Sequence, residues 1–312
     1  MELRHLRYFV AVVEEQSFTK AADKLCIAQP PLSRQIQNLE EELGIQLLER
    51  GSRPVKTTPE GHFFYQYAIK LLSNVDQMVS MTKRIASVEK TIRIGFVGSL
   101  LFGLLPRIIH LYRQAHPNLR IELYEMGTKA QTEALKEGRI DAGFGRLKIS
   151  DPAIKHTLLR NERLMVAVHA SHPLNQMKDK GVHLNDLIDE KILLYPSSPK
   201  PNFSTHVMNI FSDHGLEPTK INEVREVQLA LGLVAAGEGI SLVPASTQSI
   251  QLFNLSYVPL LDPDAITPIY IAVRNMEEST YIYSLYETIR QIYAYEGFTE
   301  PPNWLEHHHH HH

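Results

Sequence analysis

The sequence predicts an α/β protein made of three consecutive parts: a helical N-terminal domain, one long helix, and a larger domain in which strands and helices alternate. Three observations support this fold class. Residues 1–58 contain closely spaced amphipathic helices followed by a short basic segment, and residues 59–88 repeat apolar side chains at heptad spacing. From Thr91 onwards, short apolar strands alternate with helical segments, which is the pattern of doubly wound sheets.

Length and composition favour a multidomain cytoplasmic protein. The chain of 312 residues suits two or three domains with separate cores. It has no signal-peptide pattern and no apolar run long enough to span a bilayer, so no membrane association is expected. The single cysteine, Cys26, fits a reducing compartment, and we expect it to be a buried structural thiol. Residues 305–312 (LEHHHHHH) are interpreted as an expression tag.

Net charge does not mark the chain as a nucleic-acid binder. The total is −3, and residues 1–60 hold eight basic against nine acidic residues. The distribution of the charges is more informative than their sum. No acidic residue occurs between Lys24 and Asn38 or between Arg50 and Thr58. These two acid-free segments are compatible with an approach to a phosphate backbone.

Residues 3–15 predict a first helix, and the following segment has the pattern of a helix, a tight turn, a second helix and a short two-stranded wing. Ser17 is a candidate N-cap for the helix before the turn. Pro30 and Pro31 open the helix after the turn, where they are tolerated because no intrahelical donor is lost. The buried face of that helix is predicted from an apolar repeat: Leu32, Ile36, Leu39 and Leu43.

The opposite face of this second helix carries side chains that can read base edges in a major groove. Gln suits adenine, Arg suits guanine, Ser suits either, and a proline ring can contact a thymine methyl. The residues of this face are Gln29, Pro30, Pro31, Ser33, Arg34 and Gln37. Each of them alone would be read as an ordinary solvated residue. Together with the preceding helix and the basic wing, they favour DNA recognition.

The stretch AADKLCIAQPPLSRQIQNLEEELGIQLLER, followed by TTPEG, strongly resembles the winged helix-turn-helix of LysR-type transcriptional regulators. The resemblance extends over essentially the whole chain. It implies that Arg53, beside Pro54 at the tip of the wing, reaches the minor groove or its phosphates. It also implies double-stranded promoter DNA, further copies of the chain and RNA polymerase as partners. Ala28 stands where this family often has Ser or Thr, so we expect the recognition helix to be capped differently or less well.

Residues 59–88 predict one long helix that pairs with a second copy of the chain. Its apolar side chains alternate steps of four and three over three heptads, which matches a coiled-coil seam. A helix packed on its own domain is the alternative. Dimerisation would let paired recognition helices contact half-sites about 34–36 Å apart, and the resemblance implies that two dimers form a tetramer. The seam residues are Phe64, Ala68, Leu71, Val75, Met78, Thr82 and Ile85.

Residues 91–304 are predicted to form the alternating strand and helix domain. Its strands exceed the number that one small sheet would need, so we expect two subdomains with a cleft between them. The resemblance implies two lobes like those of periplasmic binding proteins: lobe I, residues 91–161 and 267–304, and lobe II, residues 162–266. Strands are expected at residues 91–97, 120–126, 140–145, 164–170, 191–196, 221–226, 240–246 and 268–274, and helices near 101–115, 129–137 and 280–295.

Several strand ends have the residues of an anion site. Ligands of open α/β sheets bind beyond the carboxyl ends of the strands, where helix N-termini offer backbone amides. Gly98–Ser99 and Gly127–Thr128 each follow a strand and open a helix, although Ser and Thr at helix starts are often plain caps. Arg146 follows a third strand and is either a cation near the mouth of the cleft or a surface salt bridge. By resemblance, the effector contacts are Gly98, Ser99, Thr128, Arg146, Asn202 and Phe203.

The resemblance also implies the ligands and the physiological role. It implies an activator of aromatic catabolism that binds cis,cis-muconate in the cleft and benzoate in a second pocket with Arg160 and Tyr293. A LysR-type repressor or activator that responds to a different small anion is the alternative. An enzyme is disfavoured, because the sequence has no G-x-S-x-G elbow, Walker loop, H-E-x-x-H or dinucleotide fingerprint. No catalytic residue, cofactor or metal site is therefore expected.

Position 156 departs from the family pattern. The resemblance implies an arginine where His156 stands in DPAIKHTLLR, so a permanent charge and a forked donor are lost at neutral pH. Because the position lies outside the predicted cleft, we hypothesise that this residue acts at an interface between effector domains and changes inducer dependence.

Overall fold

The computed structural model describes residues 1–87 and 90–298, so the predicted tag lies outside the described residues. Contacts divide the chain into two compact units. The first comprises Met1–Ala86 with Asp151–Ala153, and the second comprises Ser87–Ser150 and the chain from Ile154 onwards. Within the described ranges, no helix is long and apolar enough to cross a membrane.

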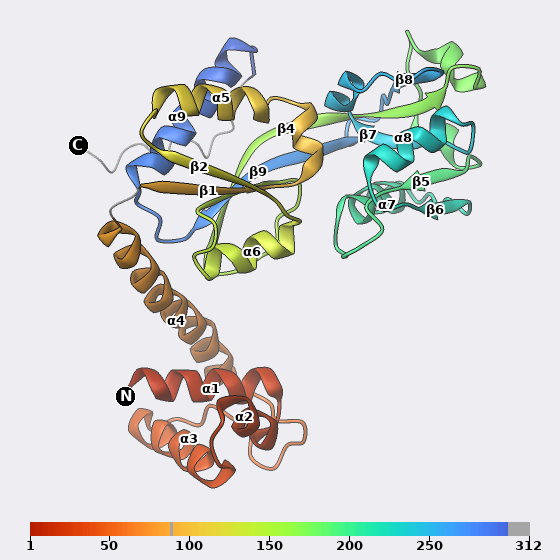
Figure 1. Cartoon of the computed structure of the whole chain (residues 1–312). Helices are drawn as coiled ribbons and strands as arrows, with labels where there is room; N and C mark the ends of the chain where they lie inside the picture. Colours follow the sequence, from red (N-terminus) through yellow and green to blue (C-terminus); the bar gives the residue numbers. More distant parts are fainter. Residues whose placement is uncertain (88–89, 299–312) are drawn as a thin grey trace. The chain divides into compact units, whose positions relative to one another are not determined.

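The first unit is the predicted helical domain with its long helix (Figure 1). Ser17 caps α2 as predicted, because its hydroxyl accepts a hydrogen bond from the Lys20 N–H at 3.2 Å. Ala28 occupies the N-cap of α3 without a side-chain hydrogen bond, which confirms that this helix is capped less well. Leu32, Ile36 and Leu39 are buried in the core of the domain. The helices are α1 (Leu3–Glu15), α2 (Phe18–Leu25), α3 (Gln29–Leu43) and α4 (Pro59–Ala86).

Two details of this domain differ from the predictions. The wing is paired through a single antiparallel bridge between Leu48 and Thr57, so it is shorter than two regular strands. The prediction of a buried Cys26 was wrong, because its thiol is exposed. Cys26 ends α2 in the left-handed conformation (φ 56°), which turns it away from the packed face that Ala21 and Ala22 occupy.

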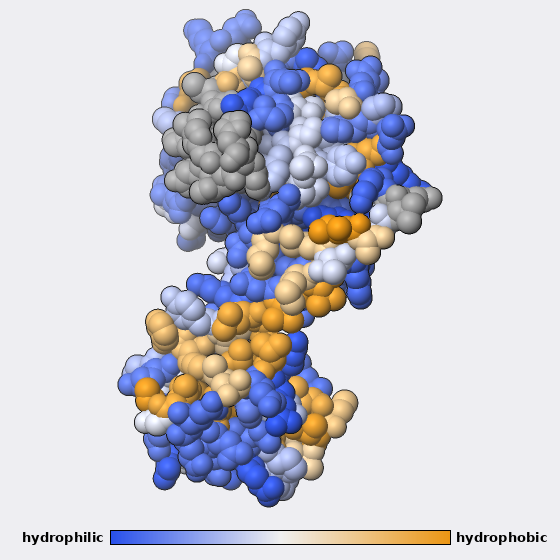
Figure 2. Space-filling model, turned by 90° about the vertical axis from the view of Figure 1, so that its left-hand side faces the viewer, coloured by the Kyte–Doolittle hydropathy of each residue, from blue (hydrophilic) through white to orange (hydrophobic). Residues whose placement is uncertain are grey.

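Helix α4 divides the predicted seam between two environments. Phe64 makes an edge-to-face contact with Phe9 of α1, with ring centroids 5.4 Å apart, and Ala68 is buried in the same domain. The first seam positions therefore pack within the chain itself. Leu71, Met78 and Ile85 remain at least half exposed. Figure 2 shows hydrophobic surface gathered over the linker helix and the adjacent face of the N-terminal domain.

The second unit contains a seven-stranded mixed sheet and a separate two-stranded sheet. The large sheet has the order β2-β1-β3-β9-β4-β7, and β8 also pairs with β4. Its strands are β1 (Thr91–Phe96), β2 (Arg120–Glu125), β3 (Ala142–Gly145), β4 (Ile154–His169), β7 (Ser241–Pro244), β8 (Leu255–Pro259) and β9 (Ile266–Arg274). The small sheet pairs β5 (Ile192–Leu194) with β6 (Ile221–Glu223) in parallel.

Strands β4 and β9 give the sheet its antiparallel centre. Strands β2, β1 and β3 are parallel, as expected for a doubly wound layer, but β9 lies antiparallel to both β3 and β4. Figure 1 shows these two long strands running from one lobe into the other. Because the chain passes between the lobes twice and in opposite senses, its two crossing segments meet as antiparallel neighbours. The α/β class is confirmed, but parallel pairing in the large sheet is limited to β2, β1 and β3, because β4 also lies antiparallel to β7 and β8.

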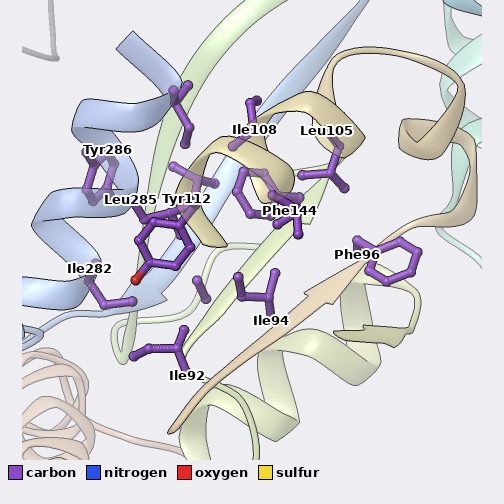
Figure 3. Packing of buried hydrophobic residues seen from close by; sticks show 14 of the residues in the cluster. Ile92, Ile94, Phe96, Leu105, Ile108, Tyr112, Phe144, Ile282, Leu285 and Tyr286 are labelled. Atoms are coloured by element: carbon purple, nitrogen blue, oxygen red, sulfur yellow. The ribbon is translucent and has the colours of Figure 1, made fainter. Parts of the chain in front are cut away.

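Helices cover the sheet and enclose a core in each lobe. In lobe I, side chains of β1, β3, α5 and α9 point towards one another around the buried Tyr112 and Phe144 (Figure 3). In lobe II, α7 buries Val207 and Phe211 against the strands. The α-helices are α5 (Leu105–Ala115), α6 (Thr128–Lys136), α7 (Phe203–Asp213), α8 (Val227–Ala235) and α9 (Thr280–Tyr295). The short 3-10 helices are η1 (Gly98–Phe102), η2 (Pro173–Met177), η3 (Leu184–Leu187) and η4 (Ala245–Ser249).

Candidate functional site

The exposed face of α3 brings together the predicted base-reading residues. Because Leu32, Ile36 and Leu39 point into the core, the side chains at the intervening helical positions point outwards. The Gln29 side-chain amide donates a hydrogen bond to the Ser33 hydroxyl at 2.8 Å, which orders two side chains of this face. Ser33 is half-buried, and the other members are exposed: Gln29, Pro30, Pro31, Arg34 and Gln37.

The wing adds an exposed cation to the same domain. Arg53 and Pro54 are exposed at its tip. The wing is tied to α3 through Glu40, whose carboxylate accepts a hydrogen bond from the Leu47 N–H at 2.7 Å. Glu40 therefore serves the structure of the domain and is half-buried. This contact gives a structural role to one of the acidic residues that keep the net charge of the domain from being positive.

In lobe I, the predicted anion-binding residues lie at adjacent strand ends. Gly98 and Ser99 follow β1 in the short 3-10 helix η1 rather than in an α-helix, and α5 begins only at Leu105. Gly127 is the N-cap of α6, and Thr128 is its first residue. A Cβ atom on Gly145, at the end of β3, would lie 3.3 Å from the Thr128 hydroxyl oxygen. The ends of β1, β2 and β3 therefore converge at one edge of the sheet.

Arg146 is buried rather than exposed, so the salt bridge that it forms with Glu162 is not at the surface, and its contact with an effector stays a prediction. Its Nε donates to the Ser99 hydroxyl at 3.1 Å, and its Nη2 donates to Glu162 Oε1 at 2.9 Å. The Arg146 and Glu162 side chains are each only 4% exposed. The remaining nitrogen, Nη1, is buried and has no hydrogen-bond partner within the described residues. The contacts of Nε and Nη2 fix the orientation of the guanidinium, so Nη1 is a buried donor that points in one direction.

Glu162 connects the two lobes. It lies on the crossing strand β4, and its second oxygen accepts a hydrogen bond from the backbone N–H of Ser246, in η4 of lobe II, at 2.6 Å. Burial acts to raise the pKa of the Glu162 carboxyl, but the Arg146 guanidinium and the Ser246 donors outweigh burial and lower the pKa below its usual value. Glu162 is therefore ionised at neutral pH, which keeps Arg146 in place.

On lobe II, Asn202 has a local structural role. Its side-chain NH2 donates to the carbonyls of Pro196 and Pro199 at 3.0 and 2.9 Å, and its Oδ1 accepts from the Thr205 N–H at 3.2 Å as the N-cap of α7. These bonds occupy the amide that the sequence suggested for effector binding. Phe203, the first residue of α7, is half-buried and packs against Tyr195, with ring centroids 5.2 Å apart.

Tyr195 is a candidate site residue that sequence reasoning missed. Its hydroxyl is buried and has no hydrogen-bond partner within the described chain. Burial raises the pKa of Tyr195, and the charges of Arg146 and Glu162 also act on it, so the hydroxyl lies within range of this ion pair. Its position directly after β5 was the available signal, because residues at strand ends line such clefts.

A cavity of about 370 Å³ lies beside Arg146 and contains both residues predicted for a second pocket. Arg160 and Tyr293, which are far apart in sequence, both line it. The β4–β9 register shifts between Leu158 and Arg160, and this irregularity allows the adjacent Leu159 and Arg160 to line the same cavity. Its apolar wall includes Leu105, Ile108, Phe144, Leu159 and Ile269.

Arg146 belongs both to the lining of the cavity and to the group of residues at the strand ends. Arg146 and Glu162 line the cavity, while Arg146 also holds Ser99 of the converging strand ends. The Arg160 guanidinium lies over the ring of Phe298, with its carbon 3.9 Å from the ring centroid. Sequence reasoning did not anticipate Glu162, Ser246 or Phe298, because nothing in their local patterns shows that they approach Arg146 and Arg160.

Family comparisons match both parts of the chain. The family described as "Bacterial regulatory helix-turn-helix protein, lysR family" matches residues 3–62. The family described as "LysR substrate binding domain" matches residues 86–293.

Individual relatives match over nearly full length. The "Probable cat1 operon transcriptional activator" of Acinetobacter lwoffii is 43% identical over 308 residues, covering 98% of this chain and 99% of the relative. The "HTH-type transcriptional regulator CatR" of Pseudomonas putida is 42% identical over 280 residues, covering 89% and 95%.

Solved structures agree. The crystal structure of the full-length BenM E226K mutant is 99% identical, with a TM-score of 0.68, and covers 97% of this chain and 100% of that chain. This chain carries Glu226. Full-length CbnR complexed with its target DNA is 29% identical, with a TM-score of 0.60, and covers 93% and 99%.

Proposed function

Because this chain belongs to the LysR family of transcriptional regulators, we propose that it activates genes of aromatic-compound catabolism by binding promoter DNA and sensing cis,cis-muconate, with benzoate as a second effector. The observation that carries the sensing role is the buried cation of Arg146, whose Nε contacts Ser99 and whose Nη1 has no hydrogen-bond partner within the described residues. A buried guanidinium donor without an acceptor is costly, so an anion that reaches it is bound strongly.

The converging strand ends suit one end of a dicarboxylate. Thr128 and Ser99 offer hydroxyls, and the N-terminus of α6 offers backbone N–H groups and a favourable dipole. Arg146 adds the permanent charge. The relatives support an acid from aromatic breakdown, since the similar proteins include the cat1 operon activator, CatR and a BenM mutant.

The second cavity suits an aromatic monocarboxylate. Its apolar lining can bury a ring, and Arg160 supplies a cation for one carboxylate. Arg146 and Glu162 line this cavity, and Arg146 also contacts Ser99 at the strand ends. Because Arg146 is paired with Glu162, an acid in either place acts on the same ion pair. The two effectors would then be coupled through the contact between Glu162 and Ser246 of lobe II.

The DNA-binding role is supported by the outward face of α3, by the wing and by the DNA complex of the similar protein CbnR. We place this activity in the cytoplasm, on dyad-symmetric promoter sites bound by dimers that associate into tetramers. Binding of the acid would favour one arrangement of the lobes, shift how paired dimers hold the DNA, and so change access of RNA polymerase.

Titration calorimetry of the full chain with cis,cis-muconate, adipate and benzoate tests the proposal. We expect saturable muconate binding that falls at least about 10-fold in Ser99→Ala and in Thr128→Ala, because each loses a charge-assisted hydrogen bond. Ser212→Ala, an exposed serine of α7, is the control that leaves muconate binding unchanged.

Absence of muconate and benzoate binding would contradict the proposed effectors. It would favour the second candidate, a LysR-type regulator that responds to a different small anion at the same buried arginine. Screening other carboxylates and phosphates with the same variants would then identify that anion, because Ser99→Ala would still weaken its binding.

A further inference from the structure

The last described residue of the chain, Phe298, lies on the guanidinium of the second pocket. The Arg160 guanidinium carbon is 3.9 Å from the centroid of the Phe298 ring, and the Tyr293 ring meets the same ring edge-on with centroids 5.5 Å apart. All three side chains line the cavity. Phe298 is half-buried, so the ring is held by the domain rather than extended into solvent.

This arrangement has a chemical consequence for Arg160. Stacking on an aromatic face uses the flat side of a guanidinium and leaves its N–H groups, which lie in the plane, for a carboxylate. Stacking also restricts the rotamers of a long side chain, so less conformational entropy is lost when the acid binds. Phe298 thus restricts the orientation of the Arg160 side chain while its N–H groups remain available to a carboxylate.

The same ring also shapes the apolar part of the cavity. Four aromatic side chains line the cavity: Phe102, Phe144, Tyr293 and Phe298. Aromatic pairs favour edge-to-face or offset contacts beyond simple burial of area. A flat ligand ring gains these contacts, whereas a saturated ring of similar size gains only burial.

We propose that Phe298 is a specificity-determining residue of this pocket, which orients Arg160 and makes the pocket prefer aromatic monocarboxylates to saturated ones. The inference rests on the proposed function of the pocket and extends it to the selection of the ligand class.

The test compares benzoate with cyclohexanecarboxylate in calorimetric titrations of the full chain. Phe298→Leu keeps an apolar side chain but removes the aromatic face, so we expect benzoate affinity to fall about 10-fold and the preference over cyclohexanecarboxylate to fall towards unity. Phe298→Tyr retains the ring and should stay within about 2-fold of the wild type. Tyr295→Leu is the control, because Tyr295 is 82% exposed and does not line the cavity.

Binding of cis,cis-muconate serves as the internal check on folding and should be the same in every variant. Equal benzoate affinity and selectivity in Phe298→Leu and the wild type would overturn the inference alone. A parallel loss of benzoate and muconate binding in Phe298→Leu would also overturn it, because Phe298 would then support the domain as a whole. A wild-type chain that binds no benzoate would overturn the proposed second effector and this inference together.

Discussion

Arg146 concentrates the chemistry of the effector domain in one side chain. It touches Ser99 through Nε and Glu162 through Nη2, and its Nη1 has no partner within the described part of the chain. A lysine could not replace it, because a single ammonium lacks the planar fork that holds two partners in fixed directions. The ion pair is almost completely buried, so removal of one partner leaves an uncompensated charge.

Glu162→Gln should therefore lower the free energy of unfolding by about 3 kcal/mol at pH 7. The pKa of Glu162 is lowered in the folded protein, so its contribution is complete above the ordinary carboxyl pKa of 4.5 and is lost as pH falls through the lower folded value. Urea unfolding of both proteins from pH 7 to pH 3 measures this. The gap between wild type and variant should narrow only below pH 4.5; a gap that is constant with pH would argue against the ion pair as its source.

Helices α3 and α4 show how one periodic pattern can serve two surfaces. In α3, the core takes Leu32 and Ile36 and leaves Arg34 on the face towards solvent. In α4, the early seam positions pack on α1, whereas Leu71, Met78 and Ile85 stay exposed. An apolar stripe that is buried at one end and open along the rest has surface that remains to be covered, which fits pairing with a second copy.

Arg34→Ala should weaken binding to promoter DNA by about 10- to 100-fold while changing non-specific binding much less, because a base contact is lost. Fluorescence anisotropy with specific and scrambled duplexes at one salt concentration measures both affinities. Arg4→Ala is the matched control, since Arg4 is an exposed arginine of α1, where it pairs with Glu2. Equal losses on both duplexes would assign Arg34 to the phosphate backbone instead.

Met78→Glu should convert the proposed dimer to a monomer without unfolding the N-terminal domain, because it places a charge in the exposed part of the seam. Light scattering after size-exclusion chromatography measures the mass, and circular dichroism checks the helices. Asp76→Lys, an exposed change outside the seam, should leave the mass unaltered. A variant that remains dimeric would show that the seam does not hold the copies together.

At the scale of the whole molecule, regulation requires that a conformational change in the effector domain is transmitted to the rest of the oligomer. The crossing strands β4 and β9 carry residues that line the cavity, and Glu162 joins them to η4 of lobe II. His156 lies on β4 in register with Ala272 of β9, and its ring is 6.1 Å from that of Tyr270. It does not line the cavity, and its role at an interface between effector domains stays a prediction.

His156→Arg should alter the dependence of transcription on inducer while leaving muconate affinity within about 2-fold, because His156 lies within β4, away from the strand ends proposed to bind muconate, and does not line the cavity. Reporter assays over a range of muconate concentrations, together with calorimetry, separate the two effects. Identical response curves for the two proteins would exclude His156 as the origin of any changed inducer dependence.

The sequence by itself determined the features that depend on local periodicity and local sterics. Features that depend on residues close in sequence could be predicted. They are the helical repeats of α3 and α4, the cap at Ser17 and the strand ends at Gly98 and Gly127. Arg160 and Tyr293 could be paired only through the family resemblance.

Tertiary structure alone decided the burial of Arg146, the link from Glu162 to Ser246, the orphaned hydroxyl of Tyr195 and the stack of Phe298 on Arg160. It also decided that Cys26 is exposed and that Asn202 is used locally. Each of these depends on contacts between segments or on the direction of one turn, and local patterns of apolar and polar residues do not encode such directions. Periodicity indicates which face of a helix or strand is buried. A binding site depends in addition on which other elements pack against that face, and this is decided only by the tertiary structure.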